Sequence, residues 1–273
     1  MDTPQTKEAP TAPPAKEAPT APPAPTVMND ITNTPKSIVP KKKKKTPKNN
    51  TNKIQTVTLT NGRKYVGELV GGLPHGQGTM TDEDGSEYIG TWKNGERHGH
   101  GTAIYYRDMY VGEWNPFDTL GNTVYVGEWK NGNMCGQGIA TIQNDKGMYK
   151  GTTSMYNGEW KDGKRHGEGL QTWGNHTTIF GAWENDTMNG HGSMVTKNGE
   201  QYVGEFKDGF EHGQGTLTEG GEVLYKGEFA EGTKHGQGIM TRPDGFTYEG
   251  KWIYDCPECE KAASKLFPNP ELY

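Results

Sequence analysis

A sequence unit of about 23 residues returns along most of the chain, and it limits the fold to a repeat architecture. Each unit opens with the pattern Y-x-G-x-W/F, passes through a short turn and closes with a glycine-rich segment, as in YIGTWKNGERHGHG from Tyr88. The spacing is regular at 23 residues except between Tyr88 and Tyr156, where it is 22, 15 and 31 residues. Complete units begin at Tyr65, Tyr88, Tyr125, Tyr156, Ile179, Tyr202 and Tyr225, and shortened ones at Tyr110 and Tyr248.

Each unit carries the signals of a β-hairpin. Strand alternation places the Tyr, Gly and Trp of the first segment on one face and the residues between them on the other. An Asx-Gly pair follows in several units, for example Asn94-Gly95 and Asp162-Gly163, and this pair favours a tight hairpin turn. The glycine-rich segment predicts a return strand on which a ring or a neighbouring backbone approaches closely. The sequence therefore predicts a continuous antiparallel meander.

These units resemble MORN repeats (membrane occupation and recognition nexus), whose pattern is Y-x-G-x-W/F, a turn, then H-G-x-G. The resemblance covers about residues 60–252. It implies an all-β fold, an elongated single-layer antiparallel array of β-hairpin repeats, used as a scaffold, a protein-interaction platform or a membrane-associated module. We divide the chain into a disordered Pro/Lys-rich tail (1–53), the repeat array (54–252) and a C-terminal cap or tail (253–273).

Composition separates the tail from the array. Residues 1–53 hold 11 of the 17 Pro, no Gly and no aromatic residue, with ten Lys against four Asp or Glu, a net charge of +6. The remainder, with 19 Lys plus Arg against 30 Asp plus Glu, has a net charge of −11, and the sum is the −5 of the whole chain. A segment with so few apolar side chains cannot bury enough apolar surface to offset its chain entropy, so we expect the tail to be disordered.

The recurring histidines and glutamates do not predict an enzyme. Equivalent positions of successive units lie roughly 10 Å apart, too far for ligands of one metal ion, so we expect structural histidines and no metal or cofactor. Carboxylates repeated so uniformly offer no acid and base of different pKa, and we interpret them as a solvated acidic face. The Gly-x-Gly pairs lack the helix that a phosphate loop requires. The histidines are His75, His98, His166, His212 and His235, and the glutamates are Glu68, Glu113, Glu128, Glu159, Glu205 and Glu228.

The aromatic face is the predicted partner-binding site. These rings must supply most of the packing, yet a single sheet has no second layer to cover them, so we expect an exposed aromatic strip that binds a protein partner or a second copy of the chain. The candidate residues are Tyr88, Trp92, Tyr125, Trp129, Tyr156, Trp160, Trp183, Tyr202 and Phe206.

The lysine run in the tail, Lys41, Lys42, Lys43, Lys44 and Lys45, has several interpretations. It resembles a short nuclear-localisation signal, it could contact anionic lipid headgroups, and it could neutralise nucleic-acid phosphates. A solubilising tail is the alternative without a partner. We consider nucleic acid the weaker partner and expect no small-molecule substrate.

The N-terminal sequence and the cysteine content indicate the cellular compartment. The N-terminal sequence lacks a signal peptide, and the chain has three Cys, which favours an intracellular, cytoplasmic protein. Cys256 and Cys259 form one CxxC pair, half of a zinc site that only two chains together could complete. The function expected is a non-catalytic scaffold that binds through its aromatic face. The alternative is a peripheral membrane adaptor that docks through Lys41–Lys45.

Overall fold

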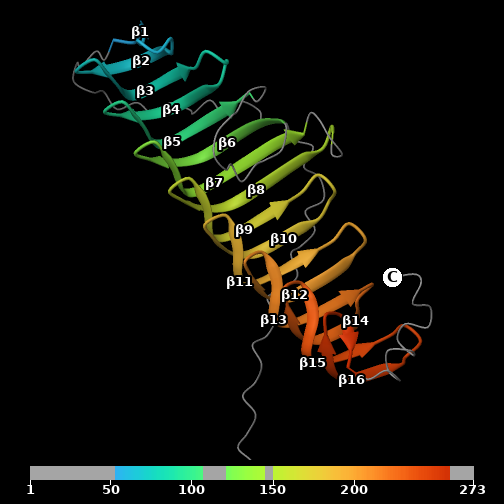
Figure 1. The fold of residues 1–273 in the computed structure, drawn as a ribbon. Helices are drawn as coiled ribbons and strands as arrows, with labels where there is room; N and C mark the ends of the chain where they lie inside the picture. Colours follow the sequence, from blue (N-terminus) through green and yellow to red (C-terminus); the bar gives the residue numbers. More distant parts are fainter. Residues whose placement is uncertain (1–52, 107–120, 145–149, 259–273) are drawn as a thin grey trace, which may run out of the picture. The chain divides into compact units, whose positions relative to one another are not determined.

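The computed structural model describes residues 53–106, 121–144 and 150–258. They form one open antiparallel sheet in which every strand pairs with the next along the chain, so that the sheet follows the sequence from one end to the other (Figure 1). The strands are β1 (Gln55–Thr58), β2 (Lys64–Val70), β3 (Leu73–Thr81), β4 (Glu87–Lys93), β5 (Glu96–Tyr105), β6 (Gly121–Lys130), β7 (Asn133–Asn144), β8 (Thr153–Lys161), β9 (Lys164–Thr172), β10 (Thr178–Glu184), β11 (Thr187–Val195), β12 (Glu200–Lys207), β13 (Phe210–Glu219), β14 (Glu222–Ala230), β15 (Thr233–Thr241), β16 (Thr247–Ile253) and β17 (Cys256–Pro257).

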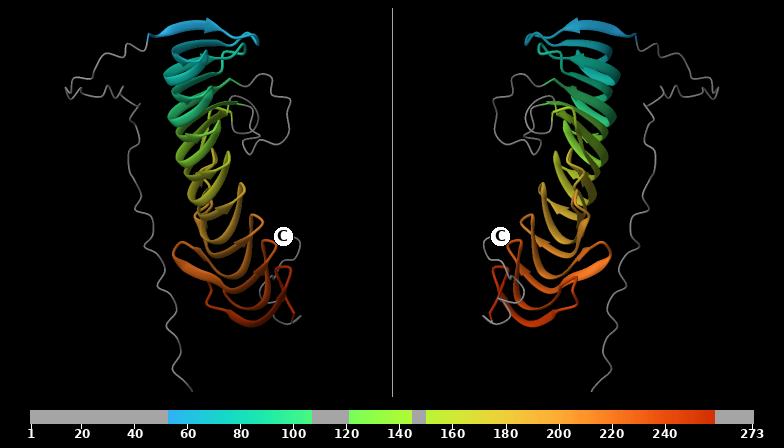
Figure 2. Two further views of the ribbon diagram at one scale, coloured as in Figure 1. Left: turned by 90° about the vertical axis from the view of Figure 1, so that its left-hand side faces the viewer. Right: turned by 90° about the vertical axis from the view of Figure 1, so that its right-hand side faces the viewer.

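The predicted fold class is confirmed. The described residues contain no helix, and consequently none that could span a membrane. The two side views show a single curved layer of strands (Figure 2). The boundaries predicted at residues 53 and 252 stay predictions, since residues 1–52 and 259–273 lie outside the described residues; the sheet itself begins at Gln55 and ends at Pro257.

The hairpin turns are built as the Asx-Gly pairs predict. In each pair both central residues have positive φ, for example 52° and 87° at Asn94 and Gly95, which is the type I′ geometry that matches the twist of the flanking strands. Each turn also bonds the preceding unit: the amide of Gly95 donates to the carbonyl of Pro74 at 2.8 Å. The turns therefore stack on one another as well as closing their own hairpins.

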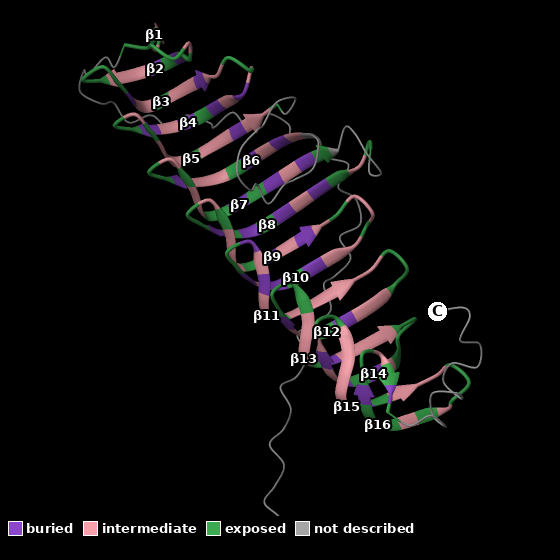
Figure 3. Ribbon diagram, viewed as in Figure 1, coloured by how far each residue is buried: buried purple, intermediate pink, exposed green. Residues whose placement is uncertain are grey.

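The core is a ladder of aromatic rings on one face of the sheet. Most of these tyrosines contact the Trp or Phe of their own unit and that of the next unit edge to face, as Tyr125 does with Trp129 at 5.1 Å and with Trp160 at 5.2 Å between ring centroids. Edge-to-face contacts of this kind add to the energy of burial. Along the strands, buried and exposed residues alternate, which leaves the opposite face to solvent (Figure 3).

The ladder is interrupted once among the described residues. Ile179 takes the place of the tyrosine in its unit, and no ring pair joins Trp183 to Phe206. Met188, 2% exposed, fills the space: its methyl carbon lies 2.7 Å from where a Cβ on Gly192 would stand. The aliphatic pair keeps the core closed but replaces the directional ring contacts at this point.

Candidate partner-binding surfaces

The nine aromatic residues predicted to bind a partner are buried. None of them is more than 5% exposed, and Tyr156 is fully covered. The prediction of an exposed aromatic strip is therefore wrong, because the rings cover one another between units and leave almost no area for another molecule. Whether a partner touches their edges stays a prediction.

In several units a basic side chain that precedes the histidine position lies over the rings. The guanidinium of Arg165 lies 4.4 Å from the ring centroid of Trp183, and that of Arg97 lies 4.6 Å from Trp129. A cation held over an aromatic face is attracted by the ring quadrupole. Sequence reasoning missed this layer, although its signal is present as a long side chain that recurs just before the H-G-x-G segment.

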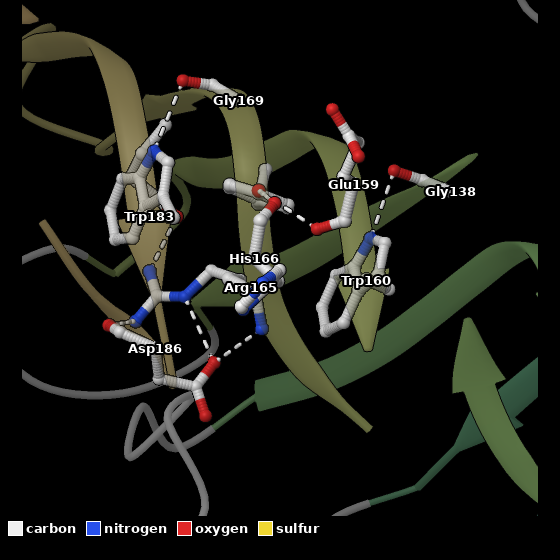
Figure 4. A network of polar contacts seen from close by, with 10 residues as sticks. Gly138, Glu159, Trp160, Arg165, His166, Gly169, Trp183 and Asp186 are labelled. Atoms are coloured by element: carbon white, nitrogen blue, oxygen red, sulfur yellow. Dashed lines mark hydrogen bonds and ion pairs between the residues drawn. The ribbon is translucent and has the colours of Figure 1, made fainter. Parts of the chain in front are cut away.

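Arg165 is the centre of a polar network (Figure 4). Its Nε donates to Asp186 Oδ1 at 3.3 Å, and one terminal nitrogen donates to the Asp186 carbonyl at 2.8 Å. The other terminal nitrogen donates to Gln171 Oε1 at 3.1 Å. Burial lowers the pKa of Arg165, and the neighbouring carboxylate of Asp186 opposes that shift. The network joins two successive hairpins. At the equivalent positions of a later pair of units, Lys234 and Asp255 form an ion pair at 3.3 Å.

The glycines that recur in the repeat units make room for the tyrosine rings. A Cβ on Gly169 would lie 2.2 Å from the hydroxyl oxygen of Tyr156, whose ring extends over the pair formed by Gly158 and Gly169. The same hydroxyl donates to the carbonyl of Glu159 at 3.1 Å. The expectation that a ring approaches the glycine-rich strand closely is confirmed, and any larger residue would displace the ring.

Burial of these hydroxyls predicts unfolding in alkali. Burial raises the pKa of Tyr88 and of Tyr225 to about 12, and it raises the pKa of Tyr156 further. In the unfolded chain the pKa of a tyrosine is ~10. The fold therefore favours the neutral phenol: this contribution to stability is complete below pH ~10 and is lost as the pH rises toward about 12. We expect the melting temperature to fall steeply over that interval, with tyrosinate absorbance beyond that of exposed tyrosines such as Tyr106 and Tyr254 appearing only as the sheet unfolds. Ionisation of Tyr88, Tyr156 or Tyr225 near pH ~10 in an intact sheet would contradict this account.

The recurring glutamates are structural. Where the strands of one hairpin lose register between Gly158 and Glu159, a β-bulge leaves the amide of Glu168 without a strand partner, and Glu159 Oε1 accepts it at 3.3 Å. Glu128, Glu205 and Glu228 accept the equivalent amides at 2.9–3.2 Å. The carboxylates face away from the rings, as predicted. The interpretation as a solvated acidic face did not include their hydrogen bonds to the backbone amides at the bulges. Glu113 lies outside the described residues.

The prediction that the histidines are structural has direct support in one unit, where a histidine nitrogen accepts a backbone amide of the next turn. The amide of Asn94, in the turn of the following unit, is 3.4 Å from His75 Nδ1. In the unit of Asn189 the amide side chain replaces histidine and accepts the amide of Asp208 at 3.0 Å. The remaining candidates, His98, His166, His212 and His235, occupy equivalent register positions opposite the first strand of their own units.

Metal and cysteine chemistry receive no support from this part of the chain. No three His, Cys, Asp or Glu side chains of the described residues come together in a way that could hold a metal ion. Cys135 and Cys256 are free thiols, and burial raises the pKa of Cys135. Cys259 and the run Lys41–Lys45 lie outside the described residues, so their proposed roles stay predictions.

A row of exposed apolar side chains, with polar residues such as Thr79 and Thr102 between some of them, crosses the sheet on the face opposite the ladder. We call it the outer row. Its members are 38–51% exposed. Strand register connects them: Ile89 pairs with Thr102, Thr102 with Val126, and Val126 with Ile139. The outer row consists of Val66, Ile89, Val126, Ile139, Phe180, Val203 and Ile239.

Carboxylates border the outer row. The bulge glutamates lie two residues further along the same face of each first strand, as Glu128 does from Val126. Lysines such as Lys130 follow at the hairpin turns. Sequence reasoning missed this surface because it assigned interaction to the aromatic face, although the β-branched residue between Tyr and Gly was the available signal.

Comparison with known proteins gives a family match. The family model described as MORN repeat matches seven segments that together hold more than half of the chain: residues 65–87, 88–107, 125–145, 156–178, 180–201, 202–218 and 225–247. No curated protein sequence matches the chain. One solved structure that is similar is the SAS-4 (dCPAP) TCP domain in complex with a proline-rich motif of Ana2 (dSTIL) of Drosophila melanogaster. It has 11% sequence identity and a TM-score of 0.28, and the match covers 77% of this chain and 97% of that chain.

Proposed function

Because the chain belongs to the MORN-repeat family, we propose that it is a non-catalytic scaffold that binds another protein along the outer row. MORN repeats serve in general as protein- or membrane-interaction modules. The observation that carries the proposal is the alignment of the exposed apolar residues Val66, Ile89, Val126 and Ile139 on one register row of a rigid sheet. Contiguous apolar surface rimmed by polar residues is typical of a protein-binding site.

The polar surroundings specify the kind of partner. A partner surface with apolar side chains in the middle and basic side chains along one border would complement both the outer row and the adjacent bulge glutamates. Each such glutamate already accepts one backbone amide, so its orientation is fixed before binding. A preorganised charge costs less to order on association. The proposal replaces the aromatic face by the opposite face as the contact surface.

The outer row is tested by site-specific crosslinking in an extract of the source cells. A photo-crosslinking residue at Val126 or Ile139 should capture one and the same protein, whereas the same residue at the exposed loop position Lys197 should not. Unlabelled wild-type chain should compete for this capture, and the variant Ile89→Lys/Ile139→Lys should not, although its melting temperature stays within a few degrees because both positions are exposed. Equal capture from Val126 and Lys197 would refute the assignment.

A second function is tethering to a membrane through Lys41–Lys45. The run is the most concentrated charge of the chain, and each basic residue near an anionic surface contributes about 1 kcal/mol. The array is acidic, so the tail rather than the repeats would carry this binding. It would place an intracellular scaffold at a membrane, and an import receptor that reads the same run would place it in the nucleus.

Liposome co-sedimentation separates tethering from protein binding. If the tail is the tether, the full chain should sediment with vesicles that contain anionic lipid and remain in solution with neutral vesicles. Replacing all five lysines by glutamine should abolish sedimentation and leave crosslinking from Val126 unchanged. Sedimentation that survives the five replacements would show that the repeats themselves bind lipid.

A further inference from the structure

The last repeat unit is half complete in the described part of the chain. Strand β16 has the sequence of a first strand, with Tyr248, Gly250 and Trp252 on the ring face. Tyr248 already holds the usual position: its ring is 5.5 Å from Trp252, and its hydroxyl donates to the carbonyl of Lys251 at 3.2 Å. The tyrosine side of a ring slot is therefore preformed at this end of the array.

The other side of the slot is supplied in every complete unit by the return strand. Gly67 pairs with Gly78, and the ring of Tyr65 extends over both. On the edge of β16 that faces away from β15, the described residues supply only β17, which pairs Trp252 with Pro257 and Ile253 with Cys256 and does not reach Gly250. Tyr248 is accordingly half-buried, whereas Tyr65, at 0% exposed, is fully covered.

The sequence that follows Glu258 does not fit the return strand of a repeat unit. The hairpin of β16 and β17 begins in the register of a repeat unit. The amide of Glu258 donates to the carbonyl of Lys251 at 2.8 Å, so Glu258 stands opposite Lys251 as His98 stands opposite Thr91. Three residues beyond that histidine stands Gly101, opposite Gly90. Three residues beyond Glu258 the sequence has Lys261 opposite Gly250, and a side chain there would collide with the Tyr248 ring. Cys259 would likewise have to adopt the positive φ of Gly99, 59°.

We propose that the edge of β16 from Thr247 to Gly250, which has no strand partner on this side among the described residues, binds an extended segment of another protein by strand addition. The complete units define its chemistry: a Gly-x-Gly strand, antiparallel to β16, whose second glycine lies opposite Gly250 under the Tyr248 ring and whose next inward residue is apolar, as in Ala103, Leu217 and Met240 opposite their tyrosines. Main-chain hydrogen bonds supply affinity in this mode and the ring slot supplies selectivity.

The opposite end of the array does not offer the same site. There β1 already pairs with the first edge of the repeats, opposite Tyr65 and Gly67, and its four residues Gln55–Thr58 contain no glycine. A second copy therefore cannot complete the slot with its own first strand, and strand addition would not chain copies end to end. The inference does not depend on the outer row, which lies on the face of the sheet rather than at its edge.

A peptide with the sequence GQGIMT, residues 236–241 of β15, tests the proposal on the full-length chain; the three preceding residues of β15 are omitted because β17 and Glu258 already occupy the corresponding positions on β16. It should bind with one site per chain and slow hydrogen exchange of the backbone amides in 247–251. A peptide with Gly238→Val should bind about tenfold more weakly or not at all, since the added side chain meets the ring. The protein variant Tyr248→Ala should lose this preference between the two peptides, and its circular dichroism reports whether the sheet is intact.

Three outcomes would overturn the proposal. These are absence of binding to the full-length chain, equal affinity of the two peptides for the wild-type chain, and protection located away from β16. The first would also follow if residues 259–273 closed the edge, and in that case the site is not available in the protein. None of these outcomes bears on crosslinking from Val126.

Discussion

Replacing Trp160 by alanine should lower the free energy of unfolding by about 3–5 kcal/mol, the range for truncating a buried aromatic side chain. The indole is 3% exposed, contacts the rings of Tyr125 and Tyr156 at 5.2 Å each, and donates from Nε1 to the carbonyl of Gly138 at 3.1 Å. Alanine would leave a cavity between two hairpins and remove that donor. Denaturant unfolding followed by circular dichroism measures the loss without relying on tryptophan emission.

Phenylalanine at the same position is the matched control. Phe206 and Phe229 occupy the equivalent place in their units and keep edge-to-face contacts of 5.2 and 5.1 Å with Tyr202 and Tyr225. Trp160→Phe should therefore cost only about 1–2 kcal/mol, for the lost hydrogen bond and the smaller ring. Similar losses for the alanine and phenylalanine variants would show that the ring ladder does not determine stability.

Removing the charge of Arg165 should be nearly as damaging. Arg165→Met leaves the Asp186 carboxylate, whose side chain is 1% exposed, with no cation beside it, and breaking a buried pair in this way typically costs about 3–5 kcal/mol. The side chain would also leave the ring of Trp183 and the amide of Gln171. Chemical denaturation of the variant against wild type gives the value.

Another repeat unit indicates which second substitution should restore the stability lost in Arg165→Met. The combination of Met with Gly occurs naturally at Met134 and Gly163, whose amide donates to the Met134 carbonyl at 2.9 Å. The double variant Arg165→Met/Asp186→Gly copies that combination and should recover most of the loss, aided by release of the positive φ of 73° at Asp186. Asp186→Gly alone should be mild, because Arg97 is found with Gly132. Additive effects of the two substitutions would exclude the proposed coupling.

Much of the fold could be predicted because the determinants are local. The Y-x-G-x-W alternation fixes which side chains face the core, and the Asx-Gly pairs fix the hairpin turns, so Asn94-Gly95 and Asp162-Gly163 lie where the sequence places them. The glycines opposite Tyr156 also follow from sequence, since a slot for a ring requires residues without side chains. Each of these statements needs no more than one unit and its neighbour.

The binding surface could not be predicted in the same way. A single sheet suggests an uncovered aromatic face, but rings of adjacent units interlock and Arg165 or Met188 lies over them, so the face closes on itself. The reach of a long side chain across two hairpins depends on the register between units. The role of Glu159 at the bulge required the same register, since only the structure shows which amide loses its strand partner.

The interruption of the ring ladder at Ile179 has a consequence for how the array responds to load. Rings are coupled in sequence from Tyr65 to Trp183 and again from Phe206 to Tyr248; between the two series strand pairing continues, but aliphatic packing replaces the ring contacts in the core. Because stability in such arrays is the sum of nearest-neighbour terms, a weaker junction divides the array into two cooperative blocks. Under a pulling force the two blocks would then unfold in separate steps, and a partner bound to one block could stay bound while the other block unfolds.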